Sequence, residues 1–227
     1  MRVMGGVLLG AIGGILLLGS GSFADERPLS PAQVALFESN QLQDIARPVV
    51  LEYAFHHTGG MAGDFDDKVT ADIRSIHPDG RKDIWIDFLT GPHHVNFPPA
   101  LGFNGNPLLM FFLEHDVTEM RDATGGAAQY FRNRIRDAFV DRAEMRAVDI
   151  TLDGKSEKAT EIALAPFRDD PHFAQFPSFR DKTYHFILAD AVPGRIYEIS
   201  TTLPSRDDTK NSFEEAMTYR SEHDETP

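Results

Sequence analysis

An alternation of apolar and polar residues limits most strongly what this chain of 227 residues can fold into. In residues 49–57, the large side chains of Val49, Leu51 and Tyr53 share one face of an extended strand. Hairpin turns interrupt the pattern at Asp79-Gly80, Asp153-Gly154 and Pro193-Gly194. The alternation recurs at residues 68–76, 83–89, 147–152, 159–164, 183–189 and 195–201.

These segments predict the fold class. If the unbroken apolar run at residues 108–113 is also a strand, the chain has about eight strands, most of them antiparallel neighbours. Helical segments before and between the strands need an apolar surface to pack on. We therefore expect an α+β protein, in which a curved antiparallel sheet carries an N-terminal helix and a helical insert.

Residues 29–37 predict the N-terminal helix. Ser30 and Gln33 form a capping box, and Pro31 fits the first helical position because its missing N–H is not needed there. The pattern indicates a helix from about residue 31 to 44. We expect Val34 and Phe37 on its buried side.

The insert lies between the two groups of strands. A short helix is expected at residues 117–123, and Gly125-Gly126 allows the left-handed backbone that ends a helix. A longer helix then begins near Ala127. Placing its residues 100° apart gathers one apolar stripe, which belongs on the sheet. The stripe consists of Ala128, Phe131, Ile135, Ala138 and Phe139.

Three arginines occur beside this stripe. Arg132 and Arg134 flank it from opposite sides, and Arg136 lies farther out. In one interpretation they are solvated flanks, with Arg134 paired to Asp137. In the other, Arg132 or Arg134 meets the carboxylate or phosphate of a ligand, since guanidinium groups suit such anions. The candidate binding residues are then Arg132, Arg134, Phe131, Ile135 and Phe139.

The two ends of the chain differ in character. Residues 1–24 read as a signal peptide, with Arg2, an apolar segment from Val7 to Leu18, and a cleavage site after Ala24. The alternative is an uncleaved membrane anchor. Residues 25–210 are expected to form a single domain. Residues 211–227 are polar, and we expect a tail or a short helix there.

Composition excludes several classes of function. The formal net charge of −13 disfavours binding to phosphate backbones, so nucleic acid is not expected as a partner. The chain has no cysteine, which excludes disulfides, thiolate metal sites and a cysteine nucleophile. Together with the signal peptide, this composition predicts a bacterial periplasmic protein.

Histidines are the remaining candidates for chemistry. None of them has the spacing of a known metal motif, and neither a metal nor a cofactor is predicted. His93 and His94 lie in a long irregular loop, of the kind that often carries function. A polar site that joins one of them to His115 and Asp116 is the alternative, and it would make the protein a hydrolase.

The order of elements resembles that of the periplasmic lipoprotein carriers, which are half-barrels covered by helices. The resemblance covers residues 30–203 and implies a fold that carries acyl chains, but no motif transfers a site residue. The chain has 17 phenylalanines, and a curved sheet closed by a helix can enclose an apolar cavity. We expect a binder or carrier of a hydrophobic or amphipathic molecule rather than an enzyme. The other alternative is a structural or assembly partner in the cell envelope.

Overall fold

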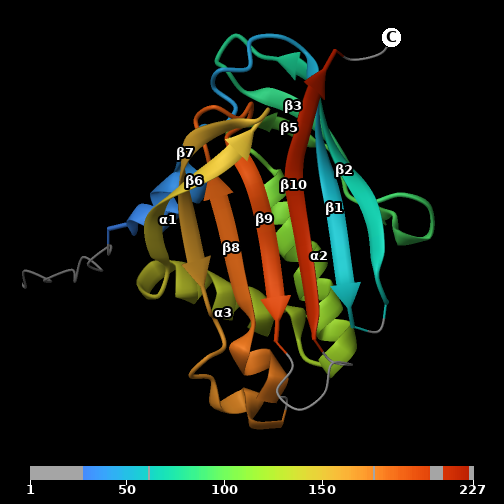
Figure 1. Cartoon of the computed structure of the whole chain (residues 1–227), viewed down its shortest axis with the longest axis vertical. Helices are drawn as coiled ribbons and strands as arrows, with labels where there is room; N and C mark the ends of the chain where they lie inside the picture. Colours follow the sequence, from blue (N-terminus) through green and yellow to red (C-terminus); the bar gives the residue numbers. More distant parts are fainter. Residues whose placement is uncertain (1–27, 61, 176, 205–211, 225–227) are drawn as a thin grey trace, which may run out of the picture.

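One antiparallel sheet dominates the computed structural model, and two long helices lie against one of its faces (Figure 1). The structure describes residues 28–60, 62–175, 177–204 and 212–224. The strands are β1 (Val49–Gly59), β2 (Phe65–Ile76), β3 (Lys82–Phe88), β4 (Val95–Asn96), β5 (Ala100–Phe103), β6 (Glu144–Leu152), β7 (Lys155–Leu164), β8 (Thr183–Leu188), β9 (Ile196–Leu203) and β10 (Phe213–His223).

The sheet is curved but not closed into a barrel. Its order is β4-β3-β2-β1-β10-β9-β8-β7-β6, and β5 pairs with β3 off this path. Hairpins join β2 to β3, β6 to β7 and β8 to β9, at the three turns predicted from the sequence. The predicted fold class is therefore confirmed, with ten strands in the described sheet instead of about eight.

Helices α2 (Leu108–Thr124) and α3 (Ala128–Asp141) form the insert. Gly125 ends α2 with a φ of 70°, as its position predicted. The apolar stripe of α3 faces the core, where Phe139 packs against Phe186 of β8. The short 3-10 helices are η2 (Gly91–His93), η3 (Pro171–Gln175) and η4 (Pro177–Asp181).

Residues 108–113 are helical, so their assignment to a strand is wrong. They form the first turns of α2, which continues through the predicted short helix without a break. A short apolar run has no period of its own that separates a buried strand from a buried helix. The buried positions of the whole helix do show a helical spacing: Leu108, Leu109, Phe112, Asp116, Val117 and Met120.

The C-terminal segment is also corrected. Residues 213–223 form β10, which lies between β1 and β9 in the middle of the sheet, and not a tail or a short helix. Its core-facing row contains Glu215, Met217 and Tyr219. The charge at Glu215 conceals the alternation in the sequence, because a buried carboxylate requires a partner that the local sequence does not reveal.

The N-terminal helix is shorter than predicted. The capping box at Ser30 is present, but α1 (Pro31–Gln33) passes into the π-helical turn η1 (Val34–Glu38) and ends there. The Gln41 side chain donates to the carbonyl oxygens of Ala35 and Leu36, which satisfies the end of the helix. This early end changes which face is buried.

Ala32 and Leu36 enter the core in place of the predicted pair. Val34 is 44% exposed and Phe37 is 41% exposed, so the prediction that they are buried is wrong. The predicted signal peptide lies outside the described residues. No helix in the described part of the chain combines the length and apolar character that a membrane crossing requires.

Candidate functional site

An apolar groove runs between the three helical segments on the side of α3 that faces α1. Its volume is about 350 Å³. It is lined by Leu29, Gln33, Phe37, Glu38, Met110, Leu113, Glu114, Val117, Arg132, Ile135, Arg136 and Phe139. We call this set of residues the three-helix groove.

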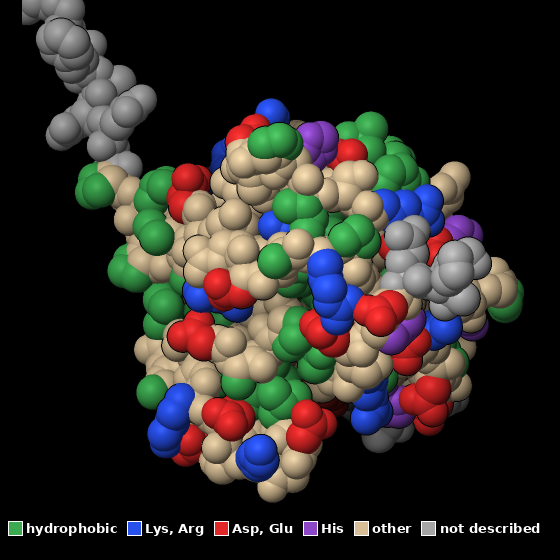
Figure 2. Space-filling model, turned by 90° about the horizontal axis from the view of Figure 1, so that it is seen from above, with side chains coloured by type: hydrophobic (Ala, Val, Ile, Leu, Met, Phe, Trp, Pro, Cys, Tyr) green, Lys and Arg blue, Asp and Glu red, His purple; other side chains and the backbone are tan. Residues whose placement is uncertain are grey.

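Large apolar side chains form its walls and floor. Leu29, Phe37 and Met110 are between 41% and 50% exposed, whereas Ile135 and Phe139 form a buried floor. The ring of Phe37 meets that of Phe139 edge to face, with the centroids 5.1 Å apart. Figure 2 shows hydrophobic side chains along the left edge of the molecule, the side on which α1 lies in Figure 1.

A network at the start of α1 fixes this wall. The Ser30 hydroxyl accepts from the Gln33 amide and donates to the Phe139 carbonyl oxygen at 2.7 Å. The first turn of α1 is therefore tied to the last turn of α3. The capping residue read from the sequence thus also positions the groove.

Charged side chains form the rim. Arg132 makes two hydrogen bonds to the Glu114 carboxylate, at 2.8 and 2.5 Å, which join α3 to α2. Arg136 is more exposed, and it makes a long contact of 3.4 Å to Asp137. The rim therefore presents one guanidinium group that is held in place and one that is free to reorient toward solvent.

Arg134 and Phe131 lie on the opposite flank of α3. Arg134 Nε lies 2.7 Å from Asp170 Oδ2 and does not form the expected pair with Asp137. Phe131 is buried against Phe167 and Phe173. Of the five predicted binding residues, the structure gathers Arg132, Ile135 and Phe139 at the groove and places the other two in this closed flank.

The four residues of the alternative polar site have different neighbours. His94 Nδ1 lies 3.1 Å from the Leu89 carbonyl oxygen, and His93 stacks on Phe65 at a centroid distance of 4.1 Å. Asp116 is buried, and it accepts hydrogen bonds from Lys182 and Tyr184, both at 2.5 Å. His115 faces Glu119 and Glu215.

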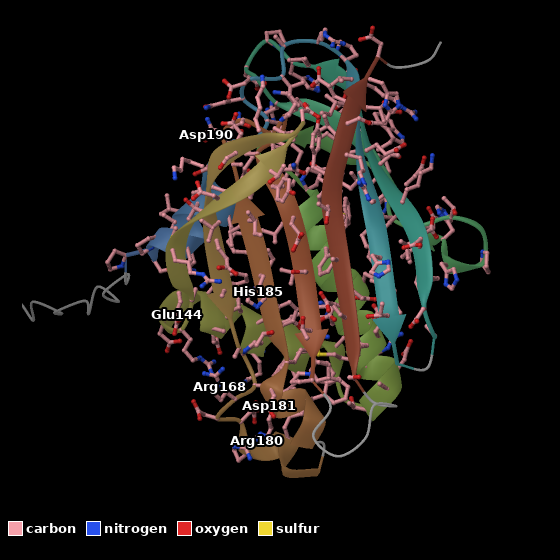
Figure 3. All side chains as sticks on the ribbon, viewed as in Figure 1. Glu144, Arg168, Arg180, Asp181, His185 and Asp190 are labelled. Carbon is pink, nitrogen blue, oxygen red and sulfur yellow. The ribbon has the colours of Figure 1, made fainter. Side chains whose placement is uncertain are left out.

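Two further hollows lie elsewhere on the molecule. One, of about 400 Å³, lies beside Arg47 and Arg195. The other, of about 530 Å³, lies at the ends of β6, β7 and β8, where Glu144, Arg168 and His185 are found (Figure 3). Their linings contain more polar and charged side chains than the three-helix groove. Of these three hollows, the three-helix groove has the walls that best suit an apolar ligand.

Sequence reasoning missed part of the groove. Phe37 and Met110 were assigned to a buried helix face and to a strand, and their exposure follows from the early end of η1 and the true start of α2. The signal available in the sequence was Asn106-Pro107, which precedes the apolar run; Asn106 Oδ1 accepts from the Leu108 amide. A polar residue and a proline before an apolar run are typical of a helix start.

Comparison with known proteins found no matching family model and no matching curated protein. Among solved structures, the Mycobacterium tuberculosis lipoprotein LppX is 12% identical with a TM-score of 0.33, over 84% of this chain and 94% of that one. A LolA superfamily protein from Nitrosomonas europaea is 6% identical with a TM-score of 0.23, over 86% and 94%. A putative outer membrane lipoprotein-sorting protein domain from Vibrio parahaemolyticus is 7% identical with a TM-score of 0.24, over 85% and 91%. The fold-level resemblance named from the order of elements is confirmed in this weak form, and it carries no conclusion about function.

Proposed function

We propose that the protein binds an amphipathic molecule in the three-helix groove, with an acyl chain among the apolar walls and an acidic head group at the rim. One observation carries this proposal: Leu29, Phe37 and Met110 expose large apolar surfaces around a single open hollow. Contiguous exposed apolar surface of this kind typically marks a binding site. Ligand pockets have volumes of about 300 to 1,000 Å³, and the groove falls at the lower end of that range.

The polar end of the ligand would meet Arg136 and Arg132. Arg136 is the better placed of the two, because its contact with Asp137 is long and exposed. Arg132 is held by Glu114, so an anion would share it with that carboxylate. Arg134, which the sequence also suggested, is engaged by Asp170 and is not part of this proposal.

The proposed place of action is the periplasm, after removal of residues 1–24. This part rests on the N-terminal sequence alone. Mass spectrometry of the protein recovered from a periplasmic extract would test it. A mass that begins at Asp25 is expected, and a membrane-bound chain of full length would contradict it.

Substitution of a methionine in the groove tests the binding site. Met110→Glu places a carboxylate in the apolar wall, and it does so in the first turn of α2, where negative charge suits a helix. Met145→Glu is the matched control, since Met145 is similarly exposed at 40% but lies on β6, outside the groove. Delipidated proteins would be titrated with a fluorescent C16 fatty acid.

We expect saturable binding by the wild type and by Met145→Glu. Met110→Glu should bind at least about tenfold more weakly, because the new carboxylate must lose its water when the acyl chain binds beside it. The proposal fails if the wild type does not bind, or if both variants lose affinity equally. Arg136→Gln then examines the head group: it should weaken binding of the fatty acid about threefold or more but leave the corresponding alcohol unaffected.

A further inference from the structure

A second cluster of interest lies beneath α2, on its sheet side. His115 and Glu119 are one turn apart on α2, Glu215 comes from β10, and His57 comes from β1. The Glu215 side chain is 1% exposed, and that of His115 is 11% exposed. Three elements distant in the sequence therefore bring imidazole and carboxylate groups together inside the protein.

The spacing of these groups fits a metal ion. Nε2 of His115 lies 3.6 Å from Oε1 of Glu119 and 3.6 Å from Oε1 of Glu215. One ligand atom from each of the three residues lies within 4.8 Å of the others. In a tetrahedral zinc site with bonds of about 2.1 Å, the ligand atoms are about 3.4 Å apart. Small side-chain movements would therefore complete three of the four ligand positions.

An unsatisfied atom points to a missing partner. Glu215 Oε1 receives a hydrogen bond from His57, but its other oxygen, Oε2, is buried without a hydrogen-bond partner among the described residues. Leaving a buried carboxylate oxygen unpaired is costly. A cation bound by this carboxylate would remove that cost.

His57 holds Glu215 in position. Its Nδ1 lies 2.9 Å from Glu215 Oε1, and its Nε2 lies 3.2 Å from the Gly59 carbonyl oxygen. The imidazole ring is stacked between Phe65 and Phe213, with centroid distances of 4.9 and 6.0 Å. Metal-binding carboxylates are commonly fixed by such a hydrogen bond from a neighbouring residue.

The remaining buried charges leave room for a cation. Asp116 is saturated by Lys182 and Tyr184, so it is not available as a ligand. Three carboxyl groups face this space, and the charge of Lys182 compensates that of Asp116. Glu119 and Glu215 are the two carboxylates that are left. A divalent ion would neutralise them, while His115 binds it as a neutral imidazole.

We propose that His115, Glu119 and Glu215 form a binding site for a divalent transition metal ion, with Zn²⁺ as its representative. The imidazole and carboxylate ligands suit zinc and its neighbours in the first transition row. The Glu119 side chain is 38% exposed, so the ion can enter the site from solvent next to Glu119. A fourth coordination position stays open on the same side. The bound ion would join α2 to β10.

Glu119→Gln is the variant that tests this site, because it keeps the shape of a partly exposed side chain but weakens a ligand. Asp122→Asn is its control: it removes one negative charge from the same helix at an exposed position outside the cluster. Chelator-treated proteins would be titrated with ZnCl₂ by calorimetry. We expect about one equivalent bound by the wild type and by Asp122→Asn, and affinity reduced at least about tenfold in Glu119→Gln.

Two outcomes would overturn the proposal: less than about a tenth of an equivalent bound by the wild type, or equal affinity in all three proteins. A second measurement needs no variant. Crystals of the wild type soaked in ZnCl₂ should show an anomalous peak at the zinc edge between His115, Glu119 and Glu215. A peak only at exposed histidines such as His56 would also contradict the proposed site.

Discussion

The two flanks of α3 carry similar residues but have different surroundings. On one flank, Phe131 and Arg134 are covered by the segment that follows β7, which supplies Phe167 and Asp170. On the other, Phe139 and Arg132 border the three-helix groove, which remains open. Each flank combines an aromatic floor with a guanidinium group, yet only one is filled by the chain itself.

This difference shows what separates a core from a candidate site. Asp170 is buried, receives a hydrogen bond from the Tyr130 hydroxyl, and forms an ion pair with Arg134 inside the protein. Glu114, the partner of Arg132, is 39% exposed, and the walls beside it face solvent. An arginine next to an apolar stripe therefore indicates a ligand only where the chain leaves the stripe uncovered.

The two flanks should differ most in how much stability is lost when an aromatic side chain is removed. Phe131→Ala creates a cavity among Phe167 and Phe173, and we expect the free energy of unfolding to fall by about 3 to 4 kcal/mol. Phe37→Ala, at 41% exposure, should cost only about 1 kcal/mol. Urea denaturation measures both. Equal losses would show that the groove is as closed as the other flank.

Loss of the buried Asp170 carboxylate should have the next largest effect on stability, and the size of this effect should depend on pH. Burial raises the pKa of Asp170, but hydrogen bonds from Tyr130 and His172, with the charge of Arg134, lower it by more. Because the folded pKa lies below the unfolded value, this carboxylate stabilises the protein above about pH 4 and loses its effect as the pH falls through the folded pKa.

Asp170→Asn should therefore cost about 2 to 3 kcal/mol at pH 7. The difference from the wild type should shrink steadily below about pH 4. Denaturation curves from pH 7 to pH 3 give the comparison. A cost that does not change with pH would mean that Asp170 acts through packing and not through its charge.

The open flank should show the smallest effect. Arg132→Ala breaks an ion pair whose side chains are 42% and 39% exposed, and solvent screens such pairs strongly. We expect a loss of less than about 1 kcal/mol, reduced further in high salt. Denaturation in low and high salt measures it. A loss as large as that of Asp170→Asn would contradict the distinction between the flanks.

The sequence predicted what local patterns determine. Alternation with Asp-Gly and Pro-Gly turns located the hairpins, and helical spacing located the buried stripe of α3. Two features depended on specific side-chain contacts. Glu215 is tolerated inside β10 because His57 of β1 meets it, and η1 ends early because Gln41 folds back to satisfy its carbonyl oxygens. Neither contact is visible in a local pattern, and the second exposes Phe37 at the groove.

Chemical-shift mapping with dodecanoate would test the central claim, that the three-helix groove is the binding site, most directly. The amides of isotope-labelled wild-type protein would be followed by nuclear magnetic resonance during the titration. We predict saturable shifts concentrated in α1, η1, the first turns of α2 and the groove side of α3, near Phe37, Met110 and Arg136. Shifts confined to the strands or to the flank of Phe131, or no saturable shifts at all, would contradict the account.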